Sequence, residues 1–457
     1  MAIFKKSASE FATPYTVTNA VTKGNIITKL SMLVMGLGCL AHKQILKGLM
    51  YLAIEVGYIL FMVENGITCL QHLITLGGRP QEEIWNEAKG VYEYVQGDNT
   101  ILFLLYGVAT LFLTAAFIIF WRANVKCAYE NECKAKKGQH INSLAEDVKA
   151  LFDGKLHYTL LVPPILGIII FTILPLVFMI CMAFTTYSKV NDNLTLFNWA
   201  GLANFTTVLG MGNSIGKTFW SVLGWTIVWA IFATFLNYIL GMMLAIVINR
   251  KTTRFKAFWR VCFMLSAAIP QFVSLLLMRT MLKDNGLINV LLQNAGLINS
   301  PLPFLTDATW ARVTVIIINL WVGIPFTMLQ VTGILQNIPA ELYEAARVDG
   351  ANAVTTFFKI TLPYMIFVTT PYLITTFTGN INNFNVIYLL TGGAPVPVGS
   401  TAGKTDLLVT WLYKLTIDQQ YYNVGAVVGI MTFVILAIVS LVTYRNTGSY
   451  KNEEGFQ

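Results

Sequence analysis

Charged residues are scarce in this sequence. Aspartate, glutamate, lysine and arginine make up only 12% of its 457 residues, whereas a soluble globular domain carries about 25%. Hydrophobic residues make up 55%, and they gather in long runs with the charges between them. This distribution excludes a single water-soluble core and indicates a chain whose segments cross a lipid bilayer.

Cysteine and histidine are also few, and neither is arranged for metal binding. The six cysteines include no C-x-x-C pair, and the four histidines fall in or near loops without metal-ligand spacing. We therefore expect free thiols, and no metal site, cofactor or disulfide framework. No nucleophile is paired with a base in the apolar part, so we expect that this chain is not an enzyme.

The net charge of +8 comes without a nucleic-acid signature. No run of lysine and arginine is interleaved with aromatic residues, so we expect no nucleic-acid partner. In a membrane protein such an excess is typical of basic cytoplasmic loops. Residues 1–23 are polar and lack an early apolar run, so we expect no cleaved signal peptide.

Eight apolar segments are long enough to cross a bilayer, which takes about 20 residues. They lie near 47–70, 100–121, 158–186, 218–248, 258–282, 311–336, 364–390 and 422–444. A further run, 27–41, is shorter and is interrupted by Gly36 and Gly38, so it is either interfacial or re-entrant. The sequence therefore predicts an all-α polytopic bundle of about eight transmembrane helices.

The charges of the loops predict the orientation of this bundle. Residues 1–46, 122–157 and 249–260 are rich in lysine and arginine, whereas the loop after the first span is acidic. This alternation follows the positive-inside rule with both termini in the cytoplasm, and an odd number of spans would break it. Prolines inside four of the last six spans fit kinked helices around a substrate path; they are Pro163, Pro164, Pro175, Pro270, Pro325 and Pro371.

The segment between the sixth and seventh spans predicts a helix–turn–helix. Pro339 to Val348 consists of good helix formers, Gly350 allows a sharp turn, and Ala353 to Lys359 continues as a second short helix. Small residues on such a cytoplasmic hairpin are typical of a docking surface. The alternative is an amphipathic helix that lies on the lipid headgroups.

The same segment resembles a known motif. It reads E-A-A-x-x-D-G-A from Glu344 to Ala351 and runs on to I-x-L-P at Pro363, and it is similar to the EAA loop of bacterial ABC importer permeases. The resemblance implies a type I importer permease fold whose cytoplasmic coupling helix sits in a cleft of the ATPase. It also implies roles for six residues: Glu344 toward a basic group of the ATPase, Asp349 in fixing the turn, and Ala345, Ala346, Gly350 and Ala351 in close packing.

A second resemblance is to the MalF-type permeases of maltose and maltodextrin importers. It rests on Asn319–Phe326 in the sixth span and on Thr376–Phe384 in the seventh, followed by Leu389–Gly393. It implies sugar contacts from Asn319, Val322, Gly323, Phe326, Thr376, Gly379, Asn380 and Asn383. Gly379 replaces an aromatic ring of the maltose-specific pattern, Phe326 replaces a tyrosine, and the outer loop 187–216 lacks the large insertion of well-known members.

The asparagines of the seventh span also suit sugar on chemical grounds. An amide both donates and accepts hydrogen bonds, as sugar hydroxyls require. Amides are costly in lipid, so they should face the interior of the bundle. Asn380 and Asn383 are three residues apart and are expected to share a helix face. The alternative is that they form hydrogen bonds between helices only.

The resemblances together imply an assembly of several subunits. The expected partners are a second homologous permease of the MalG type, two cytoplasmic ATPases, an extracellular or periplasmic sugar-binding protein, and an oligosaccharide, with lipid around the spans. We divide the chain into a cytoplasmic N-terminal segment (1–46), two extra transmembrane helices (47–157), a permease core of six helices (158–445) that contains the EAA loop (337–363), and a cytoplasmic tail (446–457).

Two alternatives to an ATP-driven importer remain at this point. An ion-gradient-driven sugar transporter predicts inverted repeats and coupling-ion ligands. Glu55 inside the first span is an intramembrane acid, for which we favour a structural role. A receptor or scaffold without a translocation path is the other. The run Gly399–Thr405 is one residue too short for a P-loop, so ATP hydrolysis is expected on another subunit. The sugar itself is maltodextrin, a galacto-oligosaccharide or another glucan.

Overall fold

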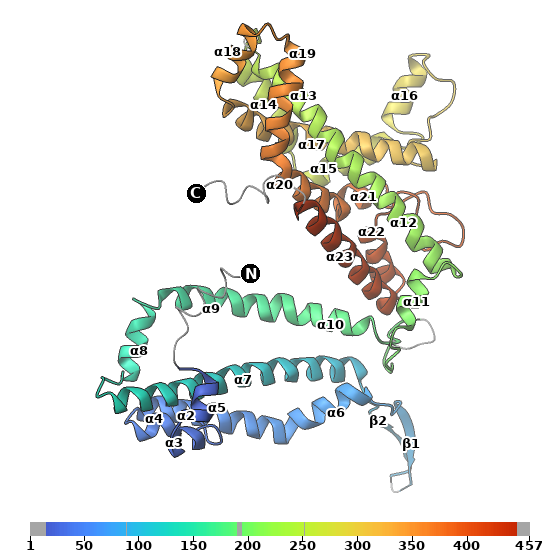
Figure 1. Cartoon of the computed structure of the whole chain (residues 1–457). Helices are drawn as coiled ribbons and strands as arrows, with labels where there is room; N and C mark the ends of the chain where they lie inside the picture. Colours follow the sequence, from blue (N-terminus) through green and yellow to red (C-terminus); the bar gives the residue numbers. More distant parts are fainter. Residues whose placement is uncertain (1–14, 88, 190–193, 251, 446–457) are drawn as a thin grey trace. The chain divides into compact units, whose positions relative to one another are not determined.

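The computed structural model describes residues 15–87, 89–189, 194–250 and 252–445 (Figure 1). The chain forms two compact units: residues 1–187 with 192–199, and residues 188–191 with 200–457. The first 14 residues and the predicted cytoplasmic tail 446–457 lie outside the described residues. Each unit is described by itself below.

The first unit is built around three long helical segments. Its elements are α2 (Val17–Lys23), α3 (Ile26–Leu30), α4 (Leu37–Ala41), the segment α5–η1–α6 (Ile45–Phe61, Met62–Gly66, Ile67–Thr75), β1 (Glu82–Asn86), β2 (Val91–Val95), α7 (Thr100–Lys136), α8 (Leu144–Leu151) and the segment α9–η2–α10 (Leu156–Ile168, Ile169–Ile173, Leu174–Met182).

The run 27–41 folds into two short helices, α3 and α4, that pack on α7 and do not span a membrane by their length. Polar side chains of α7 hold this segment. The Asn124 amide accepts from the Gly36 N–H at 2.9 Å and donates to the Ser31 carbonyl at 2.8 Å, and the Glu132 carboxylate accepts from Thr28 Oγ1 at 2.7 Å. Apolar residues on the outside, such as Leu33, stay exposed. Both features fit the expected interfacial or re-entrant segment.

Glu55 has the structural role that we favoured. Its Oε2 accepts a hydrogen bond from the Met35 N–H at 2.7 Å. Met35 belongs to the link between α3 and α4, where the backbone would otherwise lack a helical partner. A buried N–H without an acceptor is costly, so the carboxylate of α5 completes the backbone pairing of this link.

The acidic loop after the first span, α5–η1–α6, forms a two-stranded antiparallel hairpin. In this hairpin Glu82 pairs with Val95 and Asn86 with Val91. At its base the Asp98 carboxylate accepts from the backbone N–H groups of Gly78 and Arg79 at 2.9 and 3.1 Å. These two donors hold the pKa of Asp98 below its usual value.

The second unit contains most of the remaining helices. Its elements are α11 (Ala203–Leu209), the segment α12–η4–α13 (Ser214–Ile231, Phe232–Leu236, Asn237–Asn249), α14 (Lys256–Ala268), α15 (Gln271–Met281), α16 (Leu287–Asn294), α17 (Ala308–Gln336), α18 (Ala340–Val348), the segment α19–η5–α20 (Ala353–Thr356, Phe357–Thr361, Leu362–Ile381), α21 (Phe384–Leu390), α22 (Leu408–Tyr413), η6 (Lys414–Asp418) and α23 (Tyr422–Arg445).

Seven helices among the described residues are long and apolar enough to cross a membrane. They correspond to seven of the eight expected spans. The expected fifth span, 258–282, is instead two shorter helices, α14 and α15, separated at Ile269 and Pro270. Proline at that point lacks the N–H that would continue the helix and disfavours the α conformation of the residue before it. The break therefore lies where the sequence placed a kink, but it is a full interruption.

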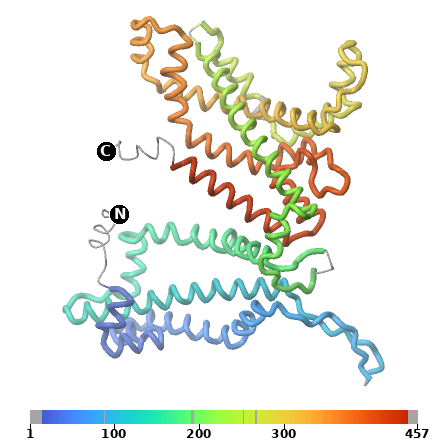
Figure 2. Tube along the Cα trace, turned by 45° about the vertical axis from the view of Figure 1, so that its right-hand side comes forward, coloured from blue at the N-terminus to red at the C-terminus, as the bar shows by residue number. Residues whose placement is uncertain are grey.

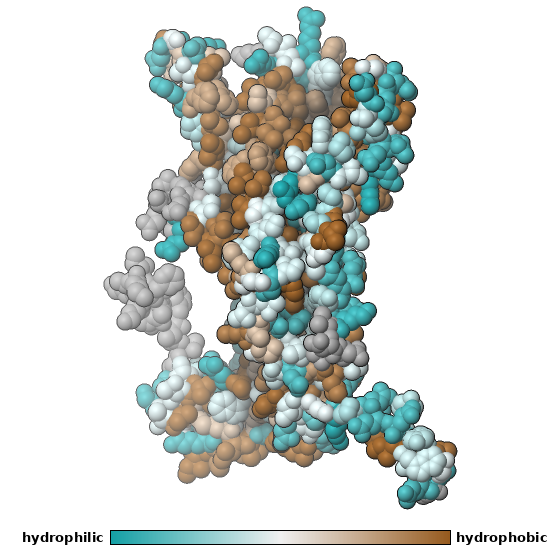
Figure 3. Space-filling view, turned by 90° about the vertical axis from the view of Figure 1, so that its right-hand side faces the viewer, coloured by the Kyte–Doolittle hydropathy of each residue, from teal (hydrophilic) through white to brown (hydrophobic). Residues whose placement is uncertain are grey.

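The spans differ in how much of their surface the chain itself covers. In the segment 214–249, 44% of the most apolar stretch is buried within the chain, whereas in the segment 156–182 only 6% of that stretch is buried. Figure 2 shows that α12, η4 and α13 run as one continuous helix through the second unit, and α13 packs along α17. Apolar side chains cover much of the surface (Figure 3), as expected of helices that face lipid or a partner subunit.

Candidate functional site

A cavity of about 210 Å³ lies among three helical segments of the second unit: η4 with α13, α17 and α20. Its lining combines amides, hydroxyls and aromatic rings. The lining residues are Ala233, Thr234, Asn237, Tyr238, Asn319, Gly323, Phe326, Thr327, Tyr372, Leu373, Thr376 and Asn380. Convergent polar groups in an otherwise apolar bundle are typical of a ligand-binding cavity.

Five of the eight residues expected to contact sugar line this cavity: Asn319, Gly323, Phe326, Thr376 and Asn380. The other three, Val322, Gly379 and Asn383, are not among the lining residues. A Cβ at Gly379 would meet open space. The position that carries an aromatic ring in the maltose-specific pattern is therefore free of neighbours in this chain.

Asn380 connects two walls of the cavity. Its Nδ2 donates to Thr234 Oγ1 at 3.0 Å, and its backbone carbonyl accepts from the buried Trp229 Nε1 at 3.0 Å. Both partners belong to the segment α12–η4–α13. The side chain thus lies toward the interior of the bundle, as the cost of an amide in lipid requires.

The prediction that Asn380 and Asn383 share a helix face was wrong, because α20 ends at Ile381. Asn383 precedes α21 and caps it: its Oδ1 accepts from the Val386 N–H at 3.3 Å. Its Nδ2 still lies 3.4 Å from Asn380 Oδ1. The two amides are neighbours through a turn rather than along one helix.

Five polar residues of the lining were missed from the sequence: Thr234, Asn237, Tyr238, Thr327 and Tyr372. The first three lie on one wall, where the π-helical turn Phe232–Leu236 adds a residue to the helix. One signal was available, since an asparagine inside the apolar run 218–248 is as unusual as those of the seventh span.

The EAA segment folds as the expected helix–turn–helix. It consists of α18, a turn at Gly350, and α19 continued by η5. Gly350 has φ +75°, a left-handed conformation, and a Cβ there would meet nothing within 4 Å. Glycine is therefore required by the backbone conformation of this turn rather than by close packing within the chain.

The surface of this hairpin is largely open. Glu344, Ala345, Asp349 and Gly350 are exposed, Ala351 is half-buried, and Ala346 is buried against the chain itself. These six are the residues to which the resemblance assigns a coupling role. A hydrogen bond joins the two arms of the hairpin: Tyr343 Oη of α18 lies 3.1 Å from Thr361 Oγ1 of η5.

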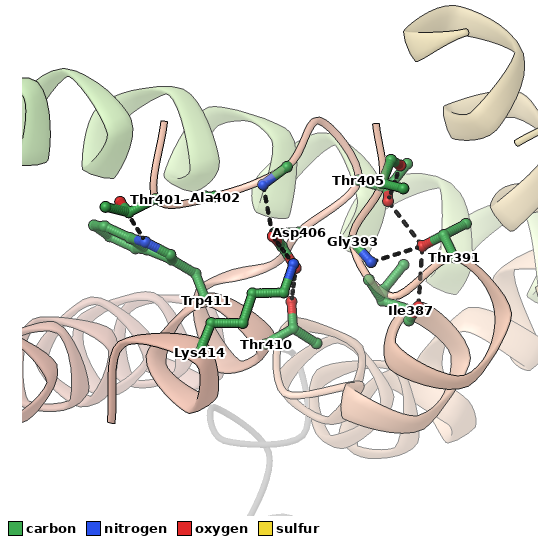
Figure 4. A network of polar contacts seen from close by, with 12 residues as sticks. Ile387, Thr391, Gly393, Thr401, Ala402, Thr405, Asp406, Thr410, Trp411 and Lys414 are labelled. Carbon is green, nitrogen blue, oxygen red and sulfur yellow. Dashed lines mark hydrogen bonds and ion pairs between the residues drawn. The ribbon is translucent and has the colours of Figure 1, made fainter. Parts of the chain in front are cut away.

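The P-loop-like run Gly399–Thr405 lies in an irregular loop that a buried carboxylate organises (Figure 4). Asp406 accepts from the Gly403 N–H at 2.7 Å and from Thr410 Oγ1 at 2.9 Å, and it pairs with Lys414 Nζ at 2.6 Å. The Gly403 amide is thus engaged within the chain. This local pairing accounts for the glycine and threonine content of the run without a nucleotide.

A second cavity of about 400 Å³ lies between this loop and the start of α12. Its lining mixes apolar and polar residues and carries two cations, Lys217 and Lys404, with Ser214, Ser221 and Ser400. It is formed by one of the loops that carry few charges in the sequence.

Comparison with known proteins identifies the family. Residues 237–447 match the model of the binding-protein-dependent transport system inner membrane component. The galactooligosaccharide transport system permease GanP of Bacillus subtilis is 33% identical over 433 residues, covering 93% of this chain and 99% of that protein. The maltodextrin transport system permease MdxF of the same organism is 33% identical over 454 residues, covering 96% and 99%.

Solved structures show the same fold. The chain is similar to a bacterial alginate ABC transporter in complex with an alginate pentasaccharide-bound periplasmic protein, with a TM-score of 0.53, 23% identity, and coverage of 68% of this chain and 97% of that one. By its sequence and its fold, this chain belongs to the inner membrane components of binding-protein-dependent transport systems.

Proposed function

We propose that this chain is a translocating subunit of an ATP-driven, binding-protein-dependent importer of oligosaccharides that works by alternating access. The observation that carries the proposal is the amide-lined cavity among α13, α17 and α20. Asn319 and Asn380 each offer a donor and an acceptor, which suits sugar hydroxyls. Transporters bind their substrates between such helices near the middle of the membrane.

The size of the cavity supports a shared site. Ligand cavities have volumes of roughly 300–1,000 Å³, and the cavity of this chain has about 210 Å³. An oligosaccharide does not fit such a volume. We infer that a second, homologous permease of the MalG type supplies the facing half of the path.

The EAA hairpin is the proposed contact with the cytoplasmic ATPases. Its exposed face, with Glu344, Ala345, Asp349 and Gly350, is available to a partner. Two cytoplasmic ATPases would close on ATP and move this hairpin, and the binding energy of ATP would shift the population between inward-facing and outward-facing states. The hairpin continues through η5 into α20, so a displacement reaches the helix that carries Asn380.

The proposed orientation puts both termini and the EAA hairpin in the cytoplasm, which requires α14 and α15 together to make the eighth crossing. The lysine and arginine excess of residues 1–46, 122–157 and 249–260 supports it. The outer loops would then receive a sugar-loaded extracellular or periplasmic binding protein, and the cavity with Lys217 and Lys404 would lie on that side.

The proposed cargo is a maltodextrin, with a galacto-oligosaccharide as the alternative. Relatives named for each sugar match this chain equally well, at 33% identity. Two departures from the maltose-specific pattern bear on the choice. Gly379 offers no ring for stacking, and Phe326, which lines the cavity, offers no hydroxyl.

The complete transporter reconstituted in vesicles tests the proposal. We expect uptake of labelled maltotriose or galactotriose that requires ATP and the binding protein and survives collapse of ion gradients. Uptake that follows the ion gradient instead would reject ATP drive. Asn380→Leu should reduce uptake while the subunits still assemble; unaltered uptake would reject the cavity as the sugar site.

A further inference from the structure

Asn237 carries an unused hydrogen-bond acceptor inside the cavity. Its side chain is buried, with 7% of the residue exposed, and it belongs to the lining. Its Nδ2 donates to the Ala233 carbonyl, one turn earlier in the helix, at 2.8 Å. Its Oδ1 is buried and has no hydrogen-bond partner among the described residues. A buried acceptor without a partner is costly, so its presence requires an explanation.

The orientation of this amide is fixed by its surroundings. Reversing the amide would place Oδ1 against the Ala233 carbonyl oxygen, and two acceptors repel each other. The donor therefore stays on the helix side and the acceptor faces away from it. Gly323 on α17 makes room for this arrangement, because a Cβ there would lie 2.8 Å from both Oδ1 and Nδ2 of Asn237.

The neighbouring side chains do not supply the missing donor. Thr234 already accepts from Asn380, and Tyr238 Oη is paired with Thr369 Oγ1 at 2.8 Å. Thr327 Oγ1 is engaged with the Gly323 carbonyl at 3.2 Å. These three hydroxyls thus have partners within the chain, and none of them donates to Asn237 Oδ1.

We propose that Asn237 is a sugar-binding residue: its Oδ1 accepts a hydrogen bond from one hydroxyl of the transported oligosaccharide. This inference rests on the proposed function. The resemblance places sugar contacts on the segments that form α17 and α20, and Asn237 adds a contact from a third wall, α13. A sugar with a hydroxyl at this position binds more tightly than one without it, because the latter leaves the buried acceptor unpaired. Asn237 therefore selects the sugar by one hydroxyl position.

The test asks whether the effect of removing one sugar hydroxyl depends on the Asn237 side chain. Vesicles with the complete transporter are given maltotriose or galactotriose, whichever the wild type imports faster, and the set of its monodeoxy analogues. One analogue should be imported about five- to tenfold less well than the parent by the wild type, as expected for one hydrogen bond. In Asn237→Ala that penalty should disappear, while penalties for the other analogues remain. Recognition by the binding protein is equal in both backgrounds and cancels.

Asn249→Ala is the matched control. Asn249 lies on the same helix and makes the same type of bond, from Nδ2 to the Ala245 carbonyl at 2.7 Å. It does not line the cavity, and its Oδ1 accepts from Arg260 instead of being unpaired. It should leave every analogue penalty in place. Asn237→Asp, which in its neutral form keeps a donor and an acceptor, should retain the selectivity. Asn237→Ser replaces the alanine variant in the same cycle if that variant does not assemble.

The outcomes separate this inference from the proposed function. If the wild type imports neither sugar with ATP, the proposed function fails. If import proceeds and no analogue penalty depends on Asn237, then a water molecule or a rearranged helix satisfies Oδ1 and this inference is overturned, while the transport assignment stands.

Discussion

Lys414 Nζ lies 2.6 Å from Asp406 Oδ2, and the Asp406 side chain is completely buried. The pair joins η6 to the loop that follows α21 (Figure 4). The carboxylate has two further donors, the Gly403 N–H and the Thr410 hydroxyl. The ion pair therefore fixes the conformation of a loop that lacks regular secondary structure.

Lys414→Met should destabilise the chain strongly, because it leaves a buried carboxylate unpaired. Removing one partner of a buried ion pair costs about 3–5 kcal/mol. We expect a lower unfolding temperature by tryptophan fluorescence in detergent, and partial recovery in Lys414→Met with Asp406→Asn. Lys89→Met is the control, since its pair with Glu93 is exposed and such pairs contribute about 0–1 kcal/mol. Equal effects of both single variants would contradict the argument.

Gly350→Val should weaken the association with the ATPases. A non-glycine residue in the left-handed conformation costs about 1–2 kcal/mol, which corresponds to roughly 5- to 30-fold in an equilibrium. Co-purification of the ATPase with the permease measures the effect. Gly350→Asn is the control, because asparagine tolerates φ +75°. An equal loss with asparagine would mean that size, not backbone conformation, matters at the interface.

Asn383→Leu should lower stability by about 1 kcal/mol through loss of the cap on α21. Asn383→Asp keeps the oxygen that accepts from the Val386 N–H and should behave as the wild type in stability. Uptake measured on both variants separates the two roles of this residue. Uptake that is lost in the aspartate variant at normal stability would show a direct contact with sugar.

Cys39 and Cys127 should form a disulfide under mild oxidation. Their Sγ atoms lie 3.6 Å apart, and each thiol loses one hydrogen to the oxidant, copper phenanthroline with oxygen. Peptide mass spectrometry should detect the link between α4 and α7. Cys127→Ser should abolish it without a new link from Cys133. Absence of the link in the wild type would contradict the packing of α4 on α7.

A reporter fused after Arg445 should report the cytoplasm, and one inserted in the hairpin turn between β1 and β2 should report the outside. The basic loops predict both results. Protease protection in intact cells gives an independent reading. An external signal after Arg445 would overturn the proposed position of the EAA hairpin.

Seven of the eight expected spans were predictable as single long helices, because an apolar run of about 20 residues has few other uses. The hairpin at Gly350 was predictable as well, since helix formers, a glycine and a second helix follow one another within a few residues. The end of α20 at Ile381 was not. The sequence Asn380–Asn383 contains neither glycine nor proline, and only the capping bond from Asn383 to Val386 reveals why the helix stops.

The third wall of the cavity escaped sequence reasoning for a physical reason. The turn Phe232–Leu236 is apolar apart from one threonine, and nothing in its composition distinguishes a π turn from an α turn. The direction in which Thr234 and Asn237 point therefore followed from the packing. The asparagine itself was visible, and its cost in an apolar helix was the usable signal.

The π turn at Phe232–Leu236 has a consequence for how such permeases diverge. Successive residues of an α-helix are about 100° apart around its axis, so deletion of the surplus residue would rotate everything beyond it by one step. Asn237 would turn away from the cavity, and a different side chain would take its place. A change of one codon in length can thus exchange the chemistry that this helix presents to the cargo.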